Sequence, residues 1–217
     1  MLDLIEHSPS AQTDASVIWL HGLGADGSDF EPVVEALSLP QVRFVLPHAP
    51  YRAVTLNNGY QMRAWYDLYG LTPGSQQDEA GIRQSQSEIE ALIAAEKARG
   101  IETRRIVLAG FSQGGAIALH TALRHAEPLA GVLALSTYLP LRSQLADEAN
   151  AANRNTPIFM AHGSFDTVIT HEIASASADL LRQQHYPLSW HEYPMAHSVC
   201  MEEIDDIRQF LRSVLHI

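Results

Sequence analysis

A serine flanked by glycines, at the junction of an apolar strand and a helix, constrains the fold of this chain more than any other segment. Residues 105–109 predict a buried parallel strand, and residues 115–120 predict a helix. Between them lies a G-x-S-x-G motif centred on Ser112. Glycines at both flanks suit a sharp strand-to-helix turn that holds the serine in a strained conformation. The motif predicts a nucleophilic serine; the alternative is a glycine-rich turn with an incidental serine.

The other apolar runs alternate between strand and helix patterns. Strands are expected at 16–21, 42–46, 131–136, 157–162 and 188–192. Helices are expected at 30–37, from the N-cap Asp78 to Gly100, at 170–184 and at 199–215. This alternation predicts an α/β fold with a mostly parallel sheet and helices on both faces. Residues 47–77 show no period but contain several aromatics, which favours a functional loop over disorder.

Length, charge and composition narrow the class of protein. A chain of 217 residues with 46% hydrophobic residues predicts one globular domain over 1–217. The formal net charge of −11 argues against nucleic-acid binding and against an anionic membrane surface. The first lysine or arginine in the chain is Arg43, so we expect no secretory signal. No apolar run is long enough to span a bilayer, so we expect no stable membrane anchor. The single cysteine, Cys200, fits a cytoplasmic protein.

A nucleophilic serine needs a base and a residue that orients the base. In hydrolases with this turn, the acid and then the histidine follow the serine along the chain. Asp166 lies just after the strand expected at 157–162, and His197 just after that at 188–192, so both fall at the same sheet edge as Ser112. Alternative acids and histidines lie where structural roles are expected: Asp147, Glu148, Glu172, Asp179, His120, His125, His162, His171, His185 and His191.

The segment Gly22-Leu23-Gly24-Ala25-Asp26-Gly27 follows the first strand and allows two interpretations. It matches the G-x-G-x-x-G pattern of dinucleotide sites, but the second strand ends without the acidic residue that such a site requires. The favoured interpretation is an oxyanion loop. The backbone N–H groups of Leu23 and of Gln113, directly after the serine, would then face the developing oxyanion.

Metal and cofactor sites find no support in the sequence. The eleven histidines show no H-E-x-x-H spacing, and one cysteine excludes cysteine-rich zinc patterns. We therefore expect no metal and no cofactor. Cys200 is expected to be a buried small side chain at a helix start and not a second nucleophile.

Five blocks spread over nearly the whole chain resemble the phospholipase/carboxylesterase family of α/β-hydrolases, which includes bacterial carboxylesterases and acyl-protein thioesterases. They are His21-Gly22-Leu23-Gly24, Trp65-Tyr66-Asp67, Gly110-Phe111-Ser112-Gln113-Gly114-Gly115, His162-Gly163 with Asp166, and Met195 with His197-Ser198 and Cys200. The resemblance implies an α/β-hydrolase fold without a large cap domain. It also implies a Ser112, His197 and Asp166 triad, and oxyanion donors at Leu23 and Gln113.

The same resemblance implies a serine carboxylesterase acting on small-molecule esters with short to medium acyl chains, with thioesters and lysophospholipids as further substrates. Trp65 and Leu71, in the 47–77 loop, are the expected acyl-binding residues. Residues 62–67 are more similar to the bacterial carboxylesterases, and residues 163–167 depart from the thioesterase pattern.

Alternative functions are an acyl-protein thioesterase, a non-catalytic binding protein on the same fold, a peptidase or an acyltransferase. The complete triad argues against a non-catalytic binder. The short chain argues against a peptidase with an added domain. The choice between monomer and homodimer stays open.

Overall fold

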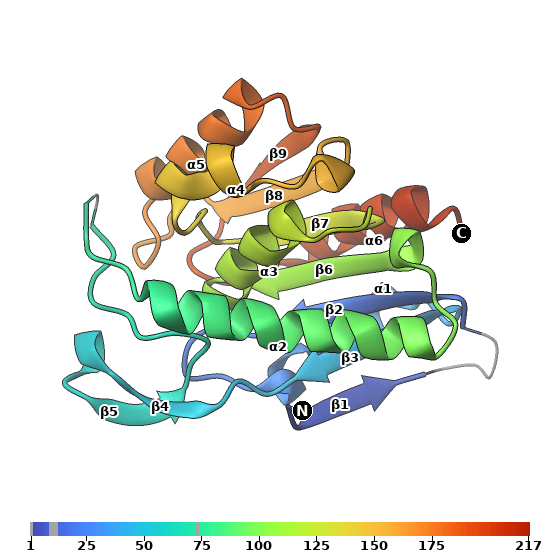
Figure 1. The fold of residues 1–217 in the computed structure, drawn as a ribbon, viewed down its shortest axis with the longest axis horizontal. Helices are drawn as coiled ribbons and strands as arrows, with labels where there is room; N and C mark the ends of the chain where they lie inside the picture. The colour runs from blue at the N-terminus through green and yellow to red at the C-terminus, as the bar shows by residue number, and fades with distance from the viewer. Residues whose placement is uncertain (1, 9–12, 73) are drawn as a thin grey trace.

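Within residues 2–8, 13–72 and 74–217, which the computed structural model describes, seven strands form one sheet with the order β1-β3-β2-β6-β7-β8-β9 (Figure 1). The strands are β1 (Leu4–His7), β2 (Ala15–Leu20), β3 (Val42–Pro47), β6 (Ile106–Phe111), β7 (Gly131–Leu135), β8 (Ile158–Gly163) and β9 (Leu188–Tyr193). All neighbouring pairs are parallel except β1 and β3. The expected mostly parallel sheet is confirmed.

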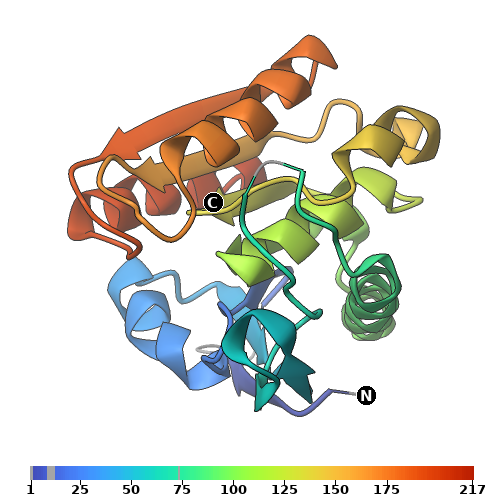
Figure 2. The same ribbon diagram turned by 90° about the vertical axis from the view of Figure 1, so that its left-hand side faces the viewer.

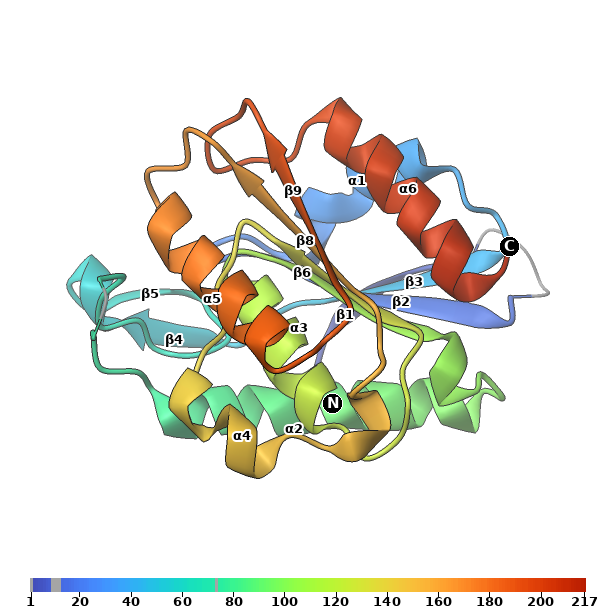
Figure 3. The same ribbon diagram turned by 90° about the horizontal axis from the view of Figure 1, so that it is seen from above.

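Helices cover both faces of this sheet (Figures 1 and 3). They are α1 (Glu31–Leu37), α2 (Glu79–Ala98), α3 (Gln113–Arg124), α4 (Leu145–Glu148), α5 (His171–Gln183) and α6 (Met201–Leu215). Short 3₁₀ turns lie at Gly27–Phe30, Thr55–Asn57, Thr103–Arg105, Arg142–Gln144 and Ala151–Asn153. None of the helices in the described part of the chain is long and apolar enough to cross a bilayer.

Alternating side chains of the central strands divide the hydrophobic core into two layers. In β2, Ile18 and Leu20 pack into the layer that contains apolar residues of α2, α3 and α5. Val17 and Trp19 pack into the opposite layer with residues of α1 and α6. Strands buried on both faces are apolar at most positions, which explains why their positions could be predicted from short apolar runs.

Two elements were missed by the sequence analysis. β1 is a four-residue edge strand that pairs antiparallel with β3. The segment expected to be an irregular loop contains a two-stranded antiparallel hairpin of β4 (Tyr51–Val54) and β5 (Tyr60–Arg63), separate from the main sheet (Figure 2). Residues of both elements are mostly half-buried or exposed, so they lack the continuous apolar run that marks the central strands.

The caps of α2 agree with the sequence. The Asp78 side chain accepts a hydrogen bond from the Gly81 N–H at 3.0 Å, and Gly100 adopts a φ of 96° just past the end of the helix. This helix lies beside α3, which begins at Gln113 instead of Gly115. Because the sheet is parallel, the loops after β2, β6, β7, β8 and β9 emerge at one edge, where ligands bind in such folds.

Candidate active site

Ser112 occupies a strained turn between β6 and α3. Its φ of 53° and ψ of −120° lie in a region that residues other than glycine rarely adopt. Close packing explains the flanking glycines, since a Cβ on Gly114 would come within 2.2 Å of the Leu20 carbonyl oxygen. The Ser112 N–H donates to the Leu135 carbonyl at 2.9 Å, which ties the turn to the end of β7.

Asp166 and His197 meet beside this turn, although 31 residues separate them. The Nδ1 atom of His197 is 2.6 Å from one carboxylate oxygen of Asp166, and the other oxygen accepts backbone N–H bonds from Val168 and Ile169 at 2.8 and 2.9 Å. The Asp166 side chain is fully buried. A carboxylate held in this way keeps the Nδ1 proton on the ring and leaves Nε2 free to accept a proton.

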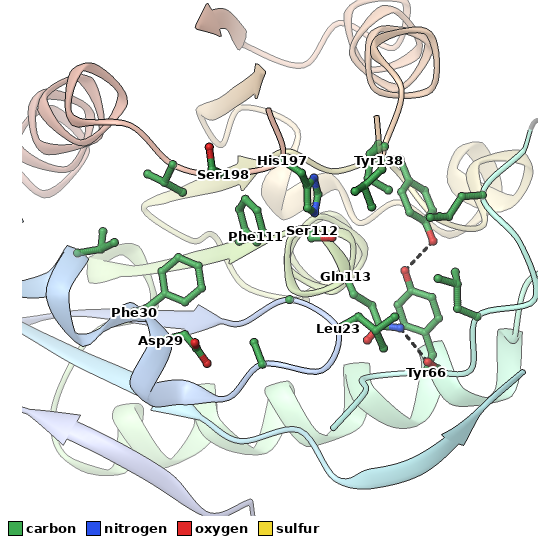
Figure 4. A pocket seen from close by; sticks show the side chains of 18 residues that line it. Leu23, Asp29, Phe30, Tyr66, Phe111, Ser112, Gln113, Tyr138, His197 and Ser198 are labelled. Carbon is green, nitrogen blue, oxygen red and sulfur yellow. Dashed lines mark hydrogen bonds between the residues drawn. The ribbon is translucent and has the colours of Figure 1, made fainter. Parts of the chain in front are cut away.

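The loop that carries His197 packs against the end of β8 at a glycine. A Cβ on Gly163 would come within 2.3 Å of the Ala196 carbonyl oxygen, so a larger residue would push the two loops apart. His197 also contacts the Phe111 ring, with the two ring centroids 4.7 Å apart. In Figure 4 the His197 ring stands over Ser112, and both residues line one cavity.

Gly22, Leu23 and Gln113 line the same cavity. Gln113 is the first residue of α3, so its N–H has no partner within the helix and faces the region where the helix dipole is positive. The oxyanion loop, defined here as residues 21–24, is held by a 2.8 Å bond from the Gly24 N–H to the Arg63 carbonyl. The arrangement brings both expected donor residues next to Ser112.

His21 holds the oxyanion loop from behind. Its Nδ1 donates to the Gly22 carbonyl at 2.7 Å, and its Nε2 accepts from the Ala49 N–H at 3.0 Å. These two partners select one neutral tautomer. Burial lowers the pKa of His21 to about 4, which is consistent with a neutral ring at neutral pH.

Of the two residues expected to bind the acyl group, only one lines the cavity. Leu71 lines the cavity. Trp65 is fully buried and does not line it; its indole N–H donates to the His21 carbonyl at 2.9 Å. Its neighbour Tyr66 lines the cavity instead. The structure therefore places Trp65 behind the oxyanion loop, where an aromatic side chain fills the core.

The cavity has a volume of about 510 Å³ and extends to both sides of Ser112. Figure 4 shows Asp29, Phe30 and Ser198 on one side, and Leu23, Tyr66 and Tyr138 on the other. Cavity-lining residues that the sequence analysis did not identify are Ala25, Asp29, Phe30, Val33, Tyr66, Leu68, Phe111, Tyr138, Val168, Ile169, Ser198 and Val199. They come from several separate segments of the chain, and only Ala25, Tyr66, Phe111 and Ser198 lie in motifs that the sequence had marked.

Three of the alternative acids and histidines, Glu148, His171 and His162, form ion pairs or hydrogen bonds with residues that have no role in the proposed chemistry or that support the Asp166 loop. Glu148 binds Arg83 and Arg124 at 2.6 and 2.7 Å, and the exposed His171 binds Glu192 at 2.7 Å. His162 lies 3.6 Å from Asp166 and its Nε2 donates to the Ile169 carbonyl at 2.8 Å, which supports the loop that carries Asp166.

Cys200 is half-buried and forms the N-cap residue of α6. Burial raises the pKa of its thiol, so it is a poor nucleophile at neutral pH. Over the residues that the structure describes, no three histidine, cysteine, aspartate or glutamate side chains gather closely enough to hold a metal ion.

Curated relatives match nearly the whole chain. Acyl-protein thioesterase 1 of Neurospora crassa is 41% identical over 213 residues, which cover 93% of this chain and 87% of that protein. Acyl-protein thioesterase 1 of Mycosarcoma maydis is 41% identical over 219 residues, covering 93% and 91%. These relatives carry the thioesterase name, although residues 62–67 and 163–167 had favoured the carboxylesterase branch.

Solved structures share the fold. Acyl-protein thioesterase 2 of Zea mays superimposes with a TM-score of 0.90 at 26% identity and covers 99% of this chain and 100% of its own. SOBER1 of Arabidopsis thaliana gives a TM-score of 0.89 at 28% identity, covering 93% and 99%. The expected α/β-hydrolase fold is confirmed by these neighbours.

The model of the Phospholipase/Carboxylesterase family matches residues 5–215. This match extends over both ends of the sheet and includes each loop of the cavity. The expectation of an enzyme that hydrolyses carboxylic esters is confirmed by this match and by the relatives above. The chain therefore belongs to the phospholipase/carboxylesterase family of α/β-hydrolases.

Proposed function

We propose that this enzyme hydrolyses acyl esters and acyl thioesters with Ser112 as nucleophile, His197 as general acid and base, and Asp166 as the residue that orients His197. One observation carries the proposal: His197, which is hydrogen-bonded to the buried Asp166 at 2.6 Å, lines the same cavity as the strained Ser112. In space, His197 thus lies between Ser112 and Asp166, which is the arrangement that acyl transfer needs.

In each of the two halves of the reaction, the His197 imidazole takes up one proton and then gives it away. His197 Nε2 takes the hydroxyl proton while Ser112 Oγ forms a bond to the acyl carbon. The tetrahedral intermediate collapses as the bond to the alcohol or thiol breaks, and the leaving group receives that proton. A water molecule then hydrolyses the acyl-enzyme: His197 takes a proton from the water as its oxygen attacks the acyl carbon, the bond from that carbon to Ser112 Oγ breaks, and His197 returns the proton to Oγ as the carboxylic acid leaves.

The backbone N–H groups of Leu23 and Gln113 are proposed to stabilise the negative charge on the carbonyl oxygen. Both residues line the cavity that contains Ser112. The packing of His21 behind this loop supports a preformed hole, because the loop needs no rearrangement when charge develops. Loss of one donor in such a hole typically reduces kcat by about 10²–10³.

The acyl chain is proposed to lie on the side of Ser112 lined by Leu23, Leu68 and Leu71. These side chains offer an apolar surface, whereas the opposite side of the cavity carries the polar side chains of Asp29 and Ser198 beside Phe30. An alcohol or thiol leaving group fits that more polar side. Trp65 supports this surface from the core rather than contacting the chain.

An acyl-protein thioesterase is the second candidate. The observation that favours it is the name of the two relatives at 41% identity. Esters and thioesters share the same tetrahedral chemistry, so the two candidates differ in the leaving group and not in the catalytic residues.

We also propose that residues 1–217 form a single domain in a cytoplasmic enzyme that needs no cofactor. The seven-stranded sheet and its two core layers, to which both ends of the chain contribute, support the single domain. The one free cysteine is consistent with a reducing compartment.

The proposal is tested by hydrolysis of p-nitrophenyl esters from acetyl to palmitoyl and of one matched thioester, with wild type beside Ser112→Ala. Wild type should hydrolyse short and medium esters, and Ser112→Ala should lose the activity by about 10⁴-fold or more in kcat. A folded wild type that is inactive on all of these substrates would contradict the proposal.

A further inference from the structure

A second cavity lies beside the one that contains Ser112. Its volume is about 540 Å³. The residues that line both cavities are Tyr66, Leu68, Leu71 and Tyr138. The wall between the two spaces therefore consists of these side chains, on the side of Ser112 where the acyl chain is proposed to lie.

One hydrogen bond closes this wall. The hydroxyl groups of Tyr66 and Tyr138 are 2.7 Å apart, and Figure 4 shows the two rings pointing toward one another. Both residues are buried. Burial raises the pKa of both hydroxyl groups, so the pair stays neutral and hydrogen-bonded over the pH range in which the enzyme would work.

The backbones on either side of the pair are fixed. The Tyr66 carbonyl accepts from the Gln113 side-chain amide at 2.8 Å. On the other loop, the Thr137 hydroxyl donates to the Ser112 carbonyl at 2.6 Å, and the Leu139 N–H donates to the Ser177 hydroxyl at 3.0 Å. The wall can therefore open by rotation of the tyrosine side chains, which breaks the hydrogen bond between them and disturbs their packing in the core.

Beyond the wall, both apolar and polar side chains line the second cavity, and the polar ones include Gln77, Arg142 and Glu172. The apolar ones include Tyr69, Leu139, Leu141, Ile173 and Ala176, from the loop before α2, the loop after β7 and the helix α5. An alkyl chain that passed the tyrosine pair would contact these five apolar side chains.

We propose that the Tyr66–Tyr138 pair is a gate for acyl-chain length: short acyl chains end against the closed pair, and longer chains displace its hydrogen bond and enter the second cavity. The proposal rests on the ester hydrolysis proposed above. A neutral hydrogen bond contributes roughly two- to tenfold to an equilibrium constant. Each buried methylene contributes roughly fourfold. Two further methylenes beyond the gate therefore offset the loss of this hydrogen bond.

The test compares kcat/KM over p-nitrophenyl esters from acetyl to palmitoyl, each below its critical micelle concentration. The enzymes are wild type, Tyr66→Phe, Tyr138→Phe and the double variant. Each single variant removes the hydrogen bond and keeps the ring, so the long-to-short ratio should rise roughly two- to tenfold. Because both changes remove the same bond, the double variant should show no larger rise than a single one.

A third substitution tests where the chain goes. Ala176 lines the second cavity from α5 and does not line the first, so Ala176→Trp places its bulk in the second cavity. Added to Tyr138→Phe, it should remove the gain for long esters and leave the acetyl ester unchanged. Asp179→Trp, at an exposed position on the same helix, is the matched control and should leave the gain in place.

The gate is wrong if the phenylalanine variants keep the wild-type ratio, if their effects add in the double variant, or if Ala176→Trp leaves the long-chain gain intact. Thermal unfolding of each variant separates these outcomes from loss of folding. If wild type hydrolyses the acetyl ester and Ser112→Ala does not, the proposed function is supported even when the gating proposal is contradicted. A wild type inactive on every ester overturns both.

Discussion

The side-chain amide of Gln113 clamps the backbone on both sides of the Trp65–Tyr66 peptide. Its Oε1 accepts from the Trp65 N–H, and its Nε2 donates to the Tyr66 carbonyl, each at 2.8 Å. Gln113 thus couples the turn that carries Ser112 to the loop that provides one wall of the cavity. The residue combines a backbone N–H that is proposed to bind the oxyanion with a side chain that holds one wall of the cavity.

Gln113→Ala should lower both stability and activity. It leaves the buried Trp65 N–H and Tyr66 carbonyl without their partner, which costs about 2–4 kcal/mol for the two groups together. Displacement of the loop should lower kcat/KM by up to about 100-fold, although the backbone N–H is kept. Urea unfolding and ester hydrolysis measure the two effects. Gln84→Ala, at an exposed position of α2, should change neither.

Asp166→Asn should lower kcat by about 10³–10⁴, because an amide beside Nδ1 favours the wrong tautomer of His197. Folding should survive, since the amide oxygen can keep the N–H bonds from Val168 and Ile169. Glu192→Gln is the matched control: Glu192 is also a carboxylate bonded to a histidine, His171, but at the surface. Equal losses in the two variants would argue against the proposed role of Asp166.

Ser112→Gly should be more stable than Ser112→Ala, although both should be inactive. At a φ of 53° and a ψ of −120°, alanine retains backbone strain of about 1–3 kcal/mol, whereas glycine loses about 0.5–1 kcal/mol through its greater freedom in the unfolded chain. We expect a difference of about 1 kcal/mol in the free energy of unfolding. An alanine variant as stable as the glycine variant would indicate an unstrained turn.

Glu203 should make the protein less stable as pH rises. Burial raises its pKa from 4.5 to about 8, so between these values the folded state holds a proton that the unfolded chain releases. The stabilisation is complete below pH 4.5 and is lost as pH rises through 8. The loss is on the order of a few kcal/mol.

Glu203→Gln keeps a neutral side chain and should remove this contribution to the pH dependence. The variant should therefore match wild type near pH 5 and exceed it in stability near pH 9. Urea unfolding across this range measures the effect. Glu202→Gln, at the exposed neighbouring position, should retain the wild-type slope; a parallel slope for Glu203→Gln would contradict the buried carboxyl.

Much of the fold could be predicted because its signals are local. The central strands are buried on both faces and read as short apolar runs, and α2 carries its caps in Asp78 and Gly100. β1 and the β4–β5 hairpin could not be predicted in this way. They lie at edges, where pairing with another strand stabilises residues that carry no continuous apolar pattern.

The site residues likewise fall into those that local sequence patterns predict and those that they do not. Ser112, Asp166 and His197 each follow a strand that the sequence marks, and the parallel sheet places such residues at one edge, so these positions could be proposed without coordinates. The role of Trp65 could not, because a tryptophan in an aromatic loop suits either the core or a substrate surface until its neighbours are known.

The sequence by itself determined the strand–serine–helix turn, the glycines around it and the order of the strands that carry the acid and the histidine. These depend on backbone sterics and apolar periodicity, which act between residues near one another in the chain. Only the tertiary structure decided that Trp65 lies behind the oxyanion loop and that Tyr66 meets Tyr138 across 72 residues. Such contacts depend on how separate loops pack, and no local sequence pattern determines which distant residues meet.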